Sequence, residues 1–175
     1  MRECNILACD PSITAWGWAI INEHNNIIAR GCIKTEPSYK KNRIRVSDDR
    51  TNRAGYIAEI LITLIEEYNI KIILTEMPHG SQNAKASVMI GIVIGFFACL
   101  NKTMDIPIEY YSEQDSKKAL LGRKDGSKQD VINAVDKIYD VPWTGTKYID
   151  EAVADSIAVH YVATKQSQIL KMIRR

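Results

Sequence analysis

The 175-residue sequence lacks the cysteine and histidine patterns of zinc-binding and disulfide-stapled proteins. Its four cysteines, Cys4, Cys9, Cys32 and Cys99, include no Cys-x-x-Cys pair, and its three histidines are not at zinc-finger spacing. We therefore expect reduced cysteines that pack in the core of a cytoplasmic protein, rather than a metal-thiolate site or a disulfide framework.

The sequence predicts neither a secretory leader nor a membrane-spanning segment. The N-terminus has no apolar segment followed by a cleavage site. The most apolar run, residues 88–100, is shorter than the roughly 18 residues that a transmembrane helix needs. We expect no membrane association, and we interpret this run as a helix that lies on a sheet.

The charge has no strong excess of either sign. The formal net charge is +2, and apolar and charged residues make up 46% and 25% of the chain, as in an ordinary globular protein. A weakly positive charge permits a nucleic-acid partner without requiring one. With no repeat, low-complexity stretch or linker, residues 1–175 are expected to form one domain.

Hydrophobic periodicity divides the chain into alternating strands and helices. Strands are predicted at 5–9, 16–21, 27–34, 71–75 and 106–111, and helices at 55–68, 84–102, 112–121, 128–139 and 148–168. Ser112 and Ser127 are placed to cap the third and fourth of these helices. Antiparallel strands followed by alternating helices and strands predict an α/β fold, a mixed five-stranded sheet with helices on both faces.

The polar segment 37–53 carries six lysine and arginine residues. Two interpretations remain open for it. One is a solvated loop that leads into a helix, and the other is a surface that contacts phosphate groups.

Carboxylates stand at the ends of three predicted elements. Asp10 ends the first strand, Glu76 ends the fourth, and Asp155 lies near the start of the last helix. Glu151, four residues before Asp155, shares its helix face, whereas Asp150 faces elsewhere and is expected to act in the first turn or as a cap. Carboxylate oxygens are the charged ligands that hard divalent cations prefer, so the pattern predicts a magnesium site.

Four segments together match one known family. They are the run Cys9-Asp10-Pro11-Ser12 with Gly17, the strand-end Glu76, the helix segment Ala154-Asp155-Ser156-Ile157-Ala158, and a Lys-x4-Gly-x5-Lys pattern met by Lys117, Gly122 and Lys128. In this order and spacing, over about residues 5–163, the chain resembles the RuvC-type Holliday junction resolvases of the RNase H-like nuclease superfamily.

The resemblance implies an RNase H-like fold and a crossover junction endodeoxyribonuclease. It implies two Mg²⁺ ions per site, replaceable by Mn²⁺, held by four carboxylates, which here are Asp10, Glu76, Glu151 and Asp155. It also implies that Lys117 and Lys128 lie against the scissile phosphate. Symmetric cleavage of a four-way junction implies a homodimer whose partner is branched DNA.

The sequence departs from the family pattern at three places. Ser12 replaces the usual glycine, and Ala152 stands where the family has its fourth acid, which leaves Glu151 as the nearest substitute. Met77, Pro78 and His79 follow Glu76, where the family often has an aromatic wedge. These departures indicate a divergent, phage-type member.

Other function classes remain as alternatives. An actin-like or sugar-kinase fold would need a glycine-rich phosphate loop and a second domain, for which 175 residues leave little room. A nucleic-acid-binding module without catalysis would not need acids on all three elements. A less selective debranching or flap endonuclease, or an RNase H-like hybrid nuclease, is not separated from a resolvase by the sequence.

Overall fold

A mixed five-stranded sheet, in the order β3-β2-β1-β4-β5, lies at the centre of the computed structural model, which describes residues 4–77 and 83–173. The strands are β1 (Asn5–Asp10), β2 (Ala15–Asn22), β3 (Ile27–Lys34), β4 (Ile70–Glu76) and β5 (Ile108–Tyr111). The first three strands are antiparallel, whereas β4 runs parallel to β1 and β5 parallel to β4. The predicted α/β class and the mixed sheet are confirmed.

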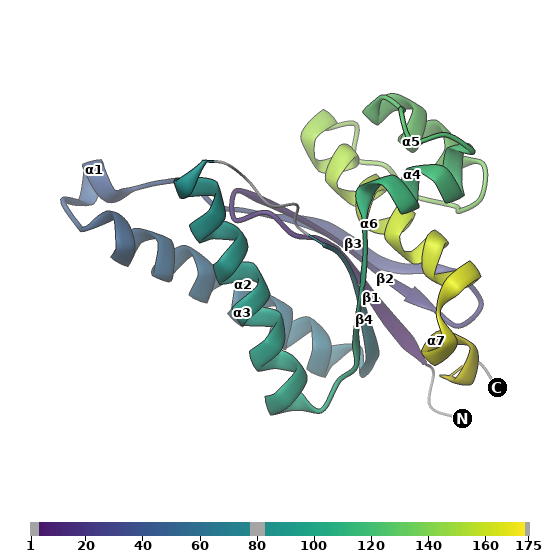
Figure 1. Ribbon diagram of the computed structural model, residues 1–175, viewed down its shortest axis with the longest axis horizontal. Helices are drawn as coiled ribbons and strands as arrows, with labels where there is room; N and C mark the ends of the chain where they lie inside the picture. Colours follow the sequence, from purple (N-terminus) through teal and green to yellow (C-terminus); the bar gives the residue numbers. More distant parts are fainter. Residues whose placement is uncertain (1–3, 78–82, 174–175) are drawn as a thin grey trace.

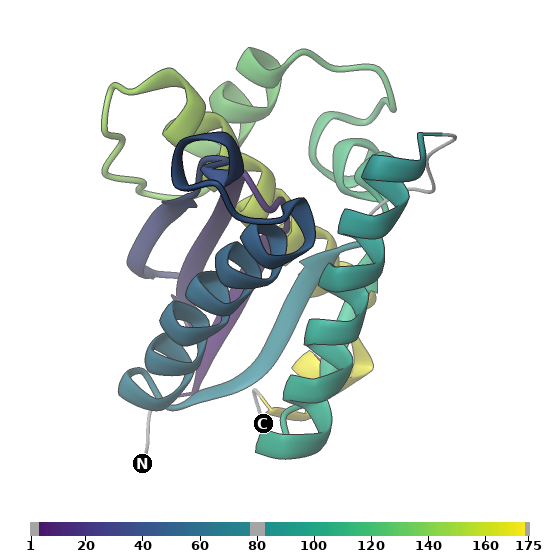
Figure 2. The ribbon, with the colours of Figure 1, turned by 90° about the vertical axis from the view of Figure 1, so that its left-hand side faces the viewer.

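Helices cover both faces of this sheet (Figure 1). They are α1 (Tyr39–Asn42), α2 (Val46–Glu67), α3 (Ala84–Met104), α4 (Glu113–Leu121), α5 (Lys128–Asp136), α6 (Lys147–Gln166) and α7 (Gln168–Ile173). The α2 and α3 helices lie on one side, and α4 to α7 lie on the other (Figure 1). Figure 2 shows α2 and α3 crossing the same face of the sheet.

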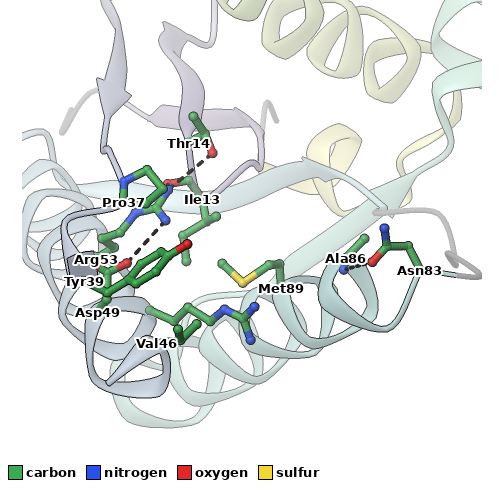
Figure 3. Close-up of a pocket in the computed structure, with 11 residues that line it drawn as sticks. Ile13, Thr14, Pro37, Tyr39, Val46, Asp49, Arg53, Asn83, Ala86 and Met89 are labelled. Carbon is green, nitrogen blue, oxygen red and sulfur yellow. Dashed lines mark hydrogen bonds and ion pairs between the residues drawn. The ribbon is translucent and has the colours of Figure 1, made fainter. Parts of the chain in front are cut away.

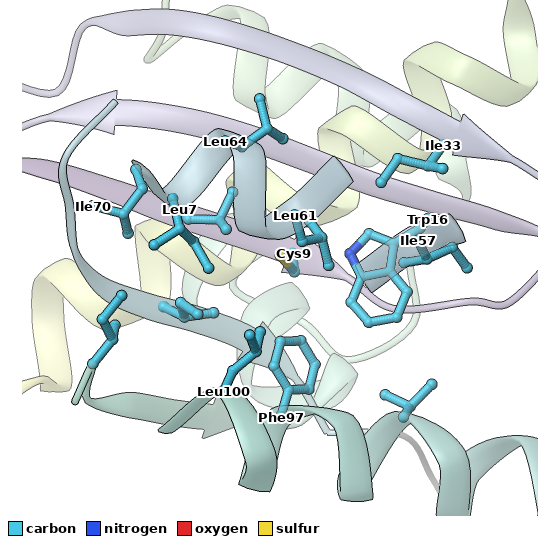
Figure 4. Close-up of a cluster of buried hydrophobic side chains, with 14 of the residues drawn as sticks. Leu7, Cys9, Trp16, Ile33, Ile57, Leu61, Leu64, Ile70, Phe97 and Leu100 are labelled. Atoms are coloured by element: carbon cyan, nitrogen blue, oxygen red, sulfur yellow. The ribbon is translucent and has the colours of Figure 1, made fainter. Parts of the chain in front are cut away.

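Side-chain alternation along β1 divides the core between the two faces. Leu7 and Cys9 point toward α2 and α3, where they pack with Leu61 and Phe97 (Figure 4). Ala8 points the opposite way, into the apolar cluster beneath α5 and α6. A strand that is apolar on both faces belongs in the middle of a covered sheet, which is where β1 lies.

The α2 helix begins at Val46, whereas the sequence predicted a helix only from residue 55. Asp48 and Asp49 stand in its first turn, where acidic side chains complement the helix dipole. Gly55 is therefore an interior residue of the helix and not its start. Most of the segment 37–53 is helical, because α1 covers residues 39–42 and α2 begins at residue 46, so the loop interpretation is wrong for residues 39–42 and 46–53.

The α3 helix is the one helix within residues 4–77 and 83–173 that is long and apolar enough to cross a membrane, over Ala86–Met104 with a mean hydropathy of 1.6. The prediction that the apolar run, residues 88–100, is too short to span a membrane is therefore wrong in its length. Only 17% of that stretch is buried. Val93, Phe97 and Leu100 are its residues in the core beneath α2 and α3, so one face of α3 packs on the sheet as expected.

Candidate active site

The two strand-end carboxylates lie at the same edge of the sheet. The β1 and β4 strands are parallel neighbours, and Cys9 pairs with Thr75 one residue before each strand ends. Asp10 and Glu76 therefore leave the sheet side by side. Parallel pairing of the two strands produces this juxtaposition, which the sequence pattern predicted without the register.

A close contact between β2 and α6 brings the third carboxylate to this edge. Gly17 pairs with Asp10 across the antiparallel β1–β2 ladder. A Cβ atom on Gly17 would lie 2.2 Å from the backbone oxygen of Ala152, so only glycine allows this approach. Asp155 lies one helical turn beyond Ala152 and is buried, which places it above the ends of the central strands.

The three carboxylates interact electrostatically. Burial raises the pKa of Asp10 to about 7, and the charge of Asp155 adds to the rise. Burial, followed by the charges of Asp10 and Asp155, raises the pKa of Glu76 to about 8. Burial also raises the pKa of Asp155, although Lys128 opposes that rise. Clustered carboxylates with raised pKa values are typical of functional sites.

Both predicted lysines lie at this cluster. The Lys128 ammonium, on the first residue of α5, donates to Asp155. Its partial burial opposes the charge, but Asp155, Asp10 and Glu113 outweigh that effect and raise the pKa of Lys128. Lys117 lies 2.7 Å from the carboxylate of Glu113, and its charge lowers the pKa of Asp155.

The α6 acids outside this cluster have other partners. Asp150 accepts hydrogen bonds from Thr144 N at 2.9 Å and Gly145 N at 2.8 Å, so it fastens the loop before the helix, as expected of a first-turn residue. Glu151 lies 3.9 Å from the ammonium of Lys147. Glu151 is not among the charges that shift the pKa values of Asp10, Glu76 and Asp155.

Glu113 is a carboxylate beside this cluster that the sequence prediction did not single out. Its charge raises the pKa values of Asp10, Glu76 and Asp155. A sequence signal was present, because the Ser112 cap places Glu113 in the first turn of a helix that directly follows a strand. The predicted serine caps at Ser112 and Ser127 are both confirmed. Pro78 and His79, at the place of the family's aromatic wedge, lie outside the described residues.

A cleft of about 450 Å³ opens beside the loop that follows Asp10, between the N-terminal parts of α2 and α3 (Figure 3). Arg53 lies in its wall, and its guanidinium donates to Thr35 Oγ1 at 2.7 Å and to the Ile13 carbonyl at 3.2 Å. It also donates to Thr14 Oγ1 at 3.3 Å and lies 3.7 Å from Asp49. Arg53 thus ties the loop after β1 to α2.

The donor set fits a hard divalent cation, because a cation would relieve the repulsion among Asp10, Glu76 and Asp155. Within residues 4–77 and 83–173, no three acidic, histidine or cysteine side chains are close enough to hold one ion as they stand. The Lys128 ammonium instead serves as the counter-ion of Asp155. A cation at Asp155 would therefore compete with this ion pair.

Residues 6–162 match the family model described as "Crossover junction endodeoxyribonuclease RuvC". The chain belongs to the RuvC family. Among its RuvC relatives, the Ehrlichia canis protein is 27% identical over 159 residues, which cover 90% of this chain and 96% of that protein. The Shewanella sediminis protein is 26% identical over 167 residues, covering 94% and 90%. The resemblance that the motifs indicated is confirmed.

Solved structures of RuvC and of another Holliday junction resolvase share the fold. Thermus thermophilus RuvC in complex with a Holliday junction substrate superposes with a TM-score of 0.70 at 16% identity, covering 92% of this chain and 93% of that one. The yeast mitochondrial Holliday junction resolvase gives a TM-score of 0.65 at 13% identity, covering 98% and 82%. The predicted RNase H-like fold is therefore confirmed.

Proposed function

We propose that this chain is a divalent-metal-dependent endonuclease that resolves four-way DNA junctions by hydrolysing phosphodiester bonds in paired strands. The observation that carries the proposal is the meeting of Asp10, Glu76 and Asp155, whose pKa values are all raised, at one sheet edge. Two lysines stand at the same edge, in a chain of the RuvC family. The structurally similar Thermus thermophilus RuvC was solved in complex with a Holliday junction substrate, which supports the choice of a four-way junction as the substrate.

The metal would be Mg²⁺, with Mn²⁺ as a substitute and two ions per site. Asp10, Glu76 and Asp155 are the proposed ligands, and Glu151 is the fourth that the sequence predicts. Two such ions supply an activated water and stabilise the charge on the leaving oxygen. The mutual repulsion of the three carboxylates supports this assignment, since a cation among them would relieve it.

The two lysines would act on the phosphate. Lys128 is half-exposed and is bonded to Asp155. With Asp155 engaged by a cation, the ammonium would be available to contact the scissile phosphate and stabilise the charge that develops on it. Lys117 stands one helical turn from Glu113 and would support the same phosphate from α4.

Junction binding would depend on local basic clusters, because the net charge of the chain is only +2. Arg50 and Arg53 line the cleft beside the loop after Asp10, and four more basic residues precede them between residues 40 and 45. A phosphate-contacting role for this region fits its position. Each such contact releases counterions, so binding should weaken steeply with salt.

A homodimer would place two active sites on one junction, and the exposed face of α3 is the proposed interface. Val88 is 48% exposed and Ile94 is 41% exposed, although both are large and apolar. Gly91 and Gly95 lie on the same face with open space above them. An apolar helix face with small residues permits close helix approach, and it is costly to leave in water.

The free cysteines support a reducing, cytoplasmic setting.

The test is cleavage of a labelled four-way junction in Mg²⁺, beside duplex, flap and RNA–DNA hybrid substrates of matched sequence. We expect paired cuts in the junction that stop when EDTA is added. Equal cleavage of flap or duplex would favour the less selective debranching nuclease. Full cleavage in excess EDTA would exclude the proposed metal site, and binding without cleavage of any substrate would favour the inactive module.

A further inference from the structure

The α4 helix begins at the edge of the sheet where β1 and β4 end. Tyr111, the last residue of β5, pairs with Glu76 in the parallel ladder. The Met77 amide also donates to the Tyr111 carbonyl at 2.8 Å, which holds the two strand ends together. Glu113 follows two residues later as the first residue of α4. The chain thereby delivers a carboxylate to the same edge as Asp10 and Glu76.

The contacts of Glu113 place it within the cluster. Its carboxylate lies 2.7 Å from the ammonium of Lys117, and the Lys117 side chain is only 16% exposed. The negative charge of Glu113 acts on Asp10, Glu76 and Asp155 and favours the charged form of Lys128. The geometry behind this is the pairing of Tyr111 with Glu76, two residues before Glu113, together with the contact between Glu113 and the poorly exposed Lys117.

A purely structural role does not account for this placement. A glutamate four residues before a lysine stabilises a helix slightly, and an acid in the first turn complements the helix dipole. Both effects would be available on an exposed face of α4. Facing three carboxylates adds repulsion instead, which is unfavourable unless a cation binds there.

Of the acids on α6, only Asp155 is among the charges that act on Asp10 and Glu76. Ala152 packs against Gly17. Asp150 is bonded to the loop at 144–145, and Glu151 faces Lys147. The place of a fourth acid is therefore open to a residue of another element.

We propose that Glu113 supplies the fourth acidic group of the metal site, from α4 rather than from α6. This inference rests on the proposed function, because it assumes that Asp10, Glu76 and Asp155 bind the catalytic cation. Mg²⁺ retains several of its waters in protein sites, so a fourth carboxylate can act on the ion directly or through bound water.

The test measures Mn²⁺ binding to the full-length, DNA-free protein by isothermal titration calorimetry. We expect Glu113→Gln to weaken binding about tenfold or more, and Glu113→Asp, which keeps the charge, to bind close to wild type. Glu151→Gln makes the same chemical change at the competing acid that the sequence predicts, and the inference expects it to weaken Mn²⁺ binding less than Glu113→Gln does. Melting temperatures in EDTA verify that each variant is folded.

The Lys117→Gln variant tests whether Glu113 acts through its own charge at the metal site or only by holding Lys117 in place. It removes a positive charge and should leave Mn²⁺ binding unchanged or tighter. If Lys117→Gln weakens binding as Glu113→Gln does, Glu113 acts only by holding Lys117, and the inference is overturned. Wild-type binding by Glu113→Gln, or a larger loss in Glu151→Gln, would overturn it as well.

Asp10→Asn distinguishes the failure of this inference from the failure of the proposed function. If Asp10→Asn loses Mn²⁺ binding while Glu113→Gln retains it, the metal site stands and only the role of Glu113 is refuted. If Asp10→Asn binds Mn²⁺ as wild type does, the proposed metal site is itself wrong.

Discussion

The ammonium group of Lys128 is bonded to the carboxylate of Asp155, which joins the N-terminus of α5 to the middle of the active-site cluster. The two residues are 27 positions apart, so the packing of α5 on α6 creates the contact. A lysine in this position substitutes for a metal ion as the counter-ion of Asp155. Its ammonium would be able to contact a DNA phosphate if a cation were bound to Asp155.

Lys128→Gln should change metal binding and cleavage in opposite directions. Removing the competing ammonium should tighten Mn²⁺ binding to the DNA-free protein. Removing a positive charge beside the phosphate should slow single-turnover junction cleavage roughly 100-fold, the usual cost of losing a group that stabilises developing charge. Lys137→Gln, the same change at the C-terminal end of α5, is the control. Weaker Mn²⁺ binding in Lys128→Gln would refute the competition.

Arg53 should affect the rate of cleavage by holding the loop that follows Asp10 in place. Arg53→Gln removes the donor to Thr35 Oγ1 and one of the two donors to the Ile13 carbonyl, to which the Thr35 hydroxyl still donates. We expect a cost of roughly 1–3 kcal/mol in the free energy of unfolding. We expect kcat to fall more than junction affinity, because the loop positions Asp10. Arg53→Lys keeps the charge but not the planar fork, and it should restore little of the rate.

Arg50→Gln is the matched control for Arg53, since it makes the same change of charge three residues away on the cleft wall. It should weaken junction binding and leave the melting temperature unchanged. If Arg53→Lys recovers the full rate, the role of Arg53 is charge alone and the loop contact is unimportant for cleavage.

Gly17→Ala should separate α6 from β2. The added Cβ would lie 2.2 Å from the Ala152 backbone oxygen, and backbone cannot move aside cheaply. We expect a loss of roughly 1–3 kcal/mol in the free energy of unfolding, as for other overpacked sites. Cleavage should fall further than stability explains, because Asp155 moves away from Asp10. Gly55→Ala, in open space on α2, should be neutral or stabilising in the same denaturation assay.

The residue pattern predicted the strands and most helices because apolar periodicity encodes burial directly. Asp10 and Glu76 were predictable because each ends an apolar strand, where a charge needs a partner. The start of α2 was not, since the polar residues 46–53 carry no apolar period and their helix depends on Asp49, which accepts from the Ser38 amide at 2.7 Å. Such a tertiary contact between segments leaves no local signal.

The sequence alone also could not determine which acidic residues form the proposed metal site. Helical spacing paired Glu151 with Asp155, yet spacing along one helix says nothing about which charges other elements bring. Glu113 reaches the site because β5 pairs with β4 and α4 turns back over the sheet edge. The role of Glu151 stays a prediction, and the Mn²⁺ titration of Glu113→Gln and Glu151→Gln decides between them.

Ile94→Glu should convert the proposed homodimer into a monomer, because it places a charge in the middle of the exposed apolar face of α3. Light scattering after size exclusion should give twice the chain mass for wild type and the single-chain mass for the variant. Met172→Glu, an equally drastic change at a residue that is 72% exposed, should remain dimeric. A monomeric wild-type protein would refute the proposed interface.

The most direct test of the active site compares junction binding with junction cleavage in Asp10→Asn, Glu76→Gln and Asp155→Asn. Each substitution removes a proposed metal ligand and also relieves repulsion toward DNA phosphates. We expect all three variants to bind a labelled four-way junction at least as tightly as wild type and to leave it uncut in Mg²⁺. Wild-type cleavage rates in these variants would contradict the proposal that these carboxylates hold the catalytic metal.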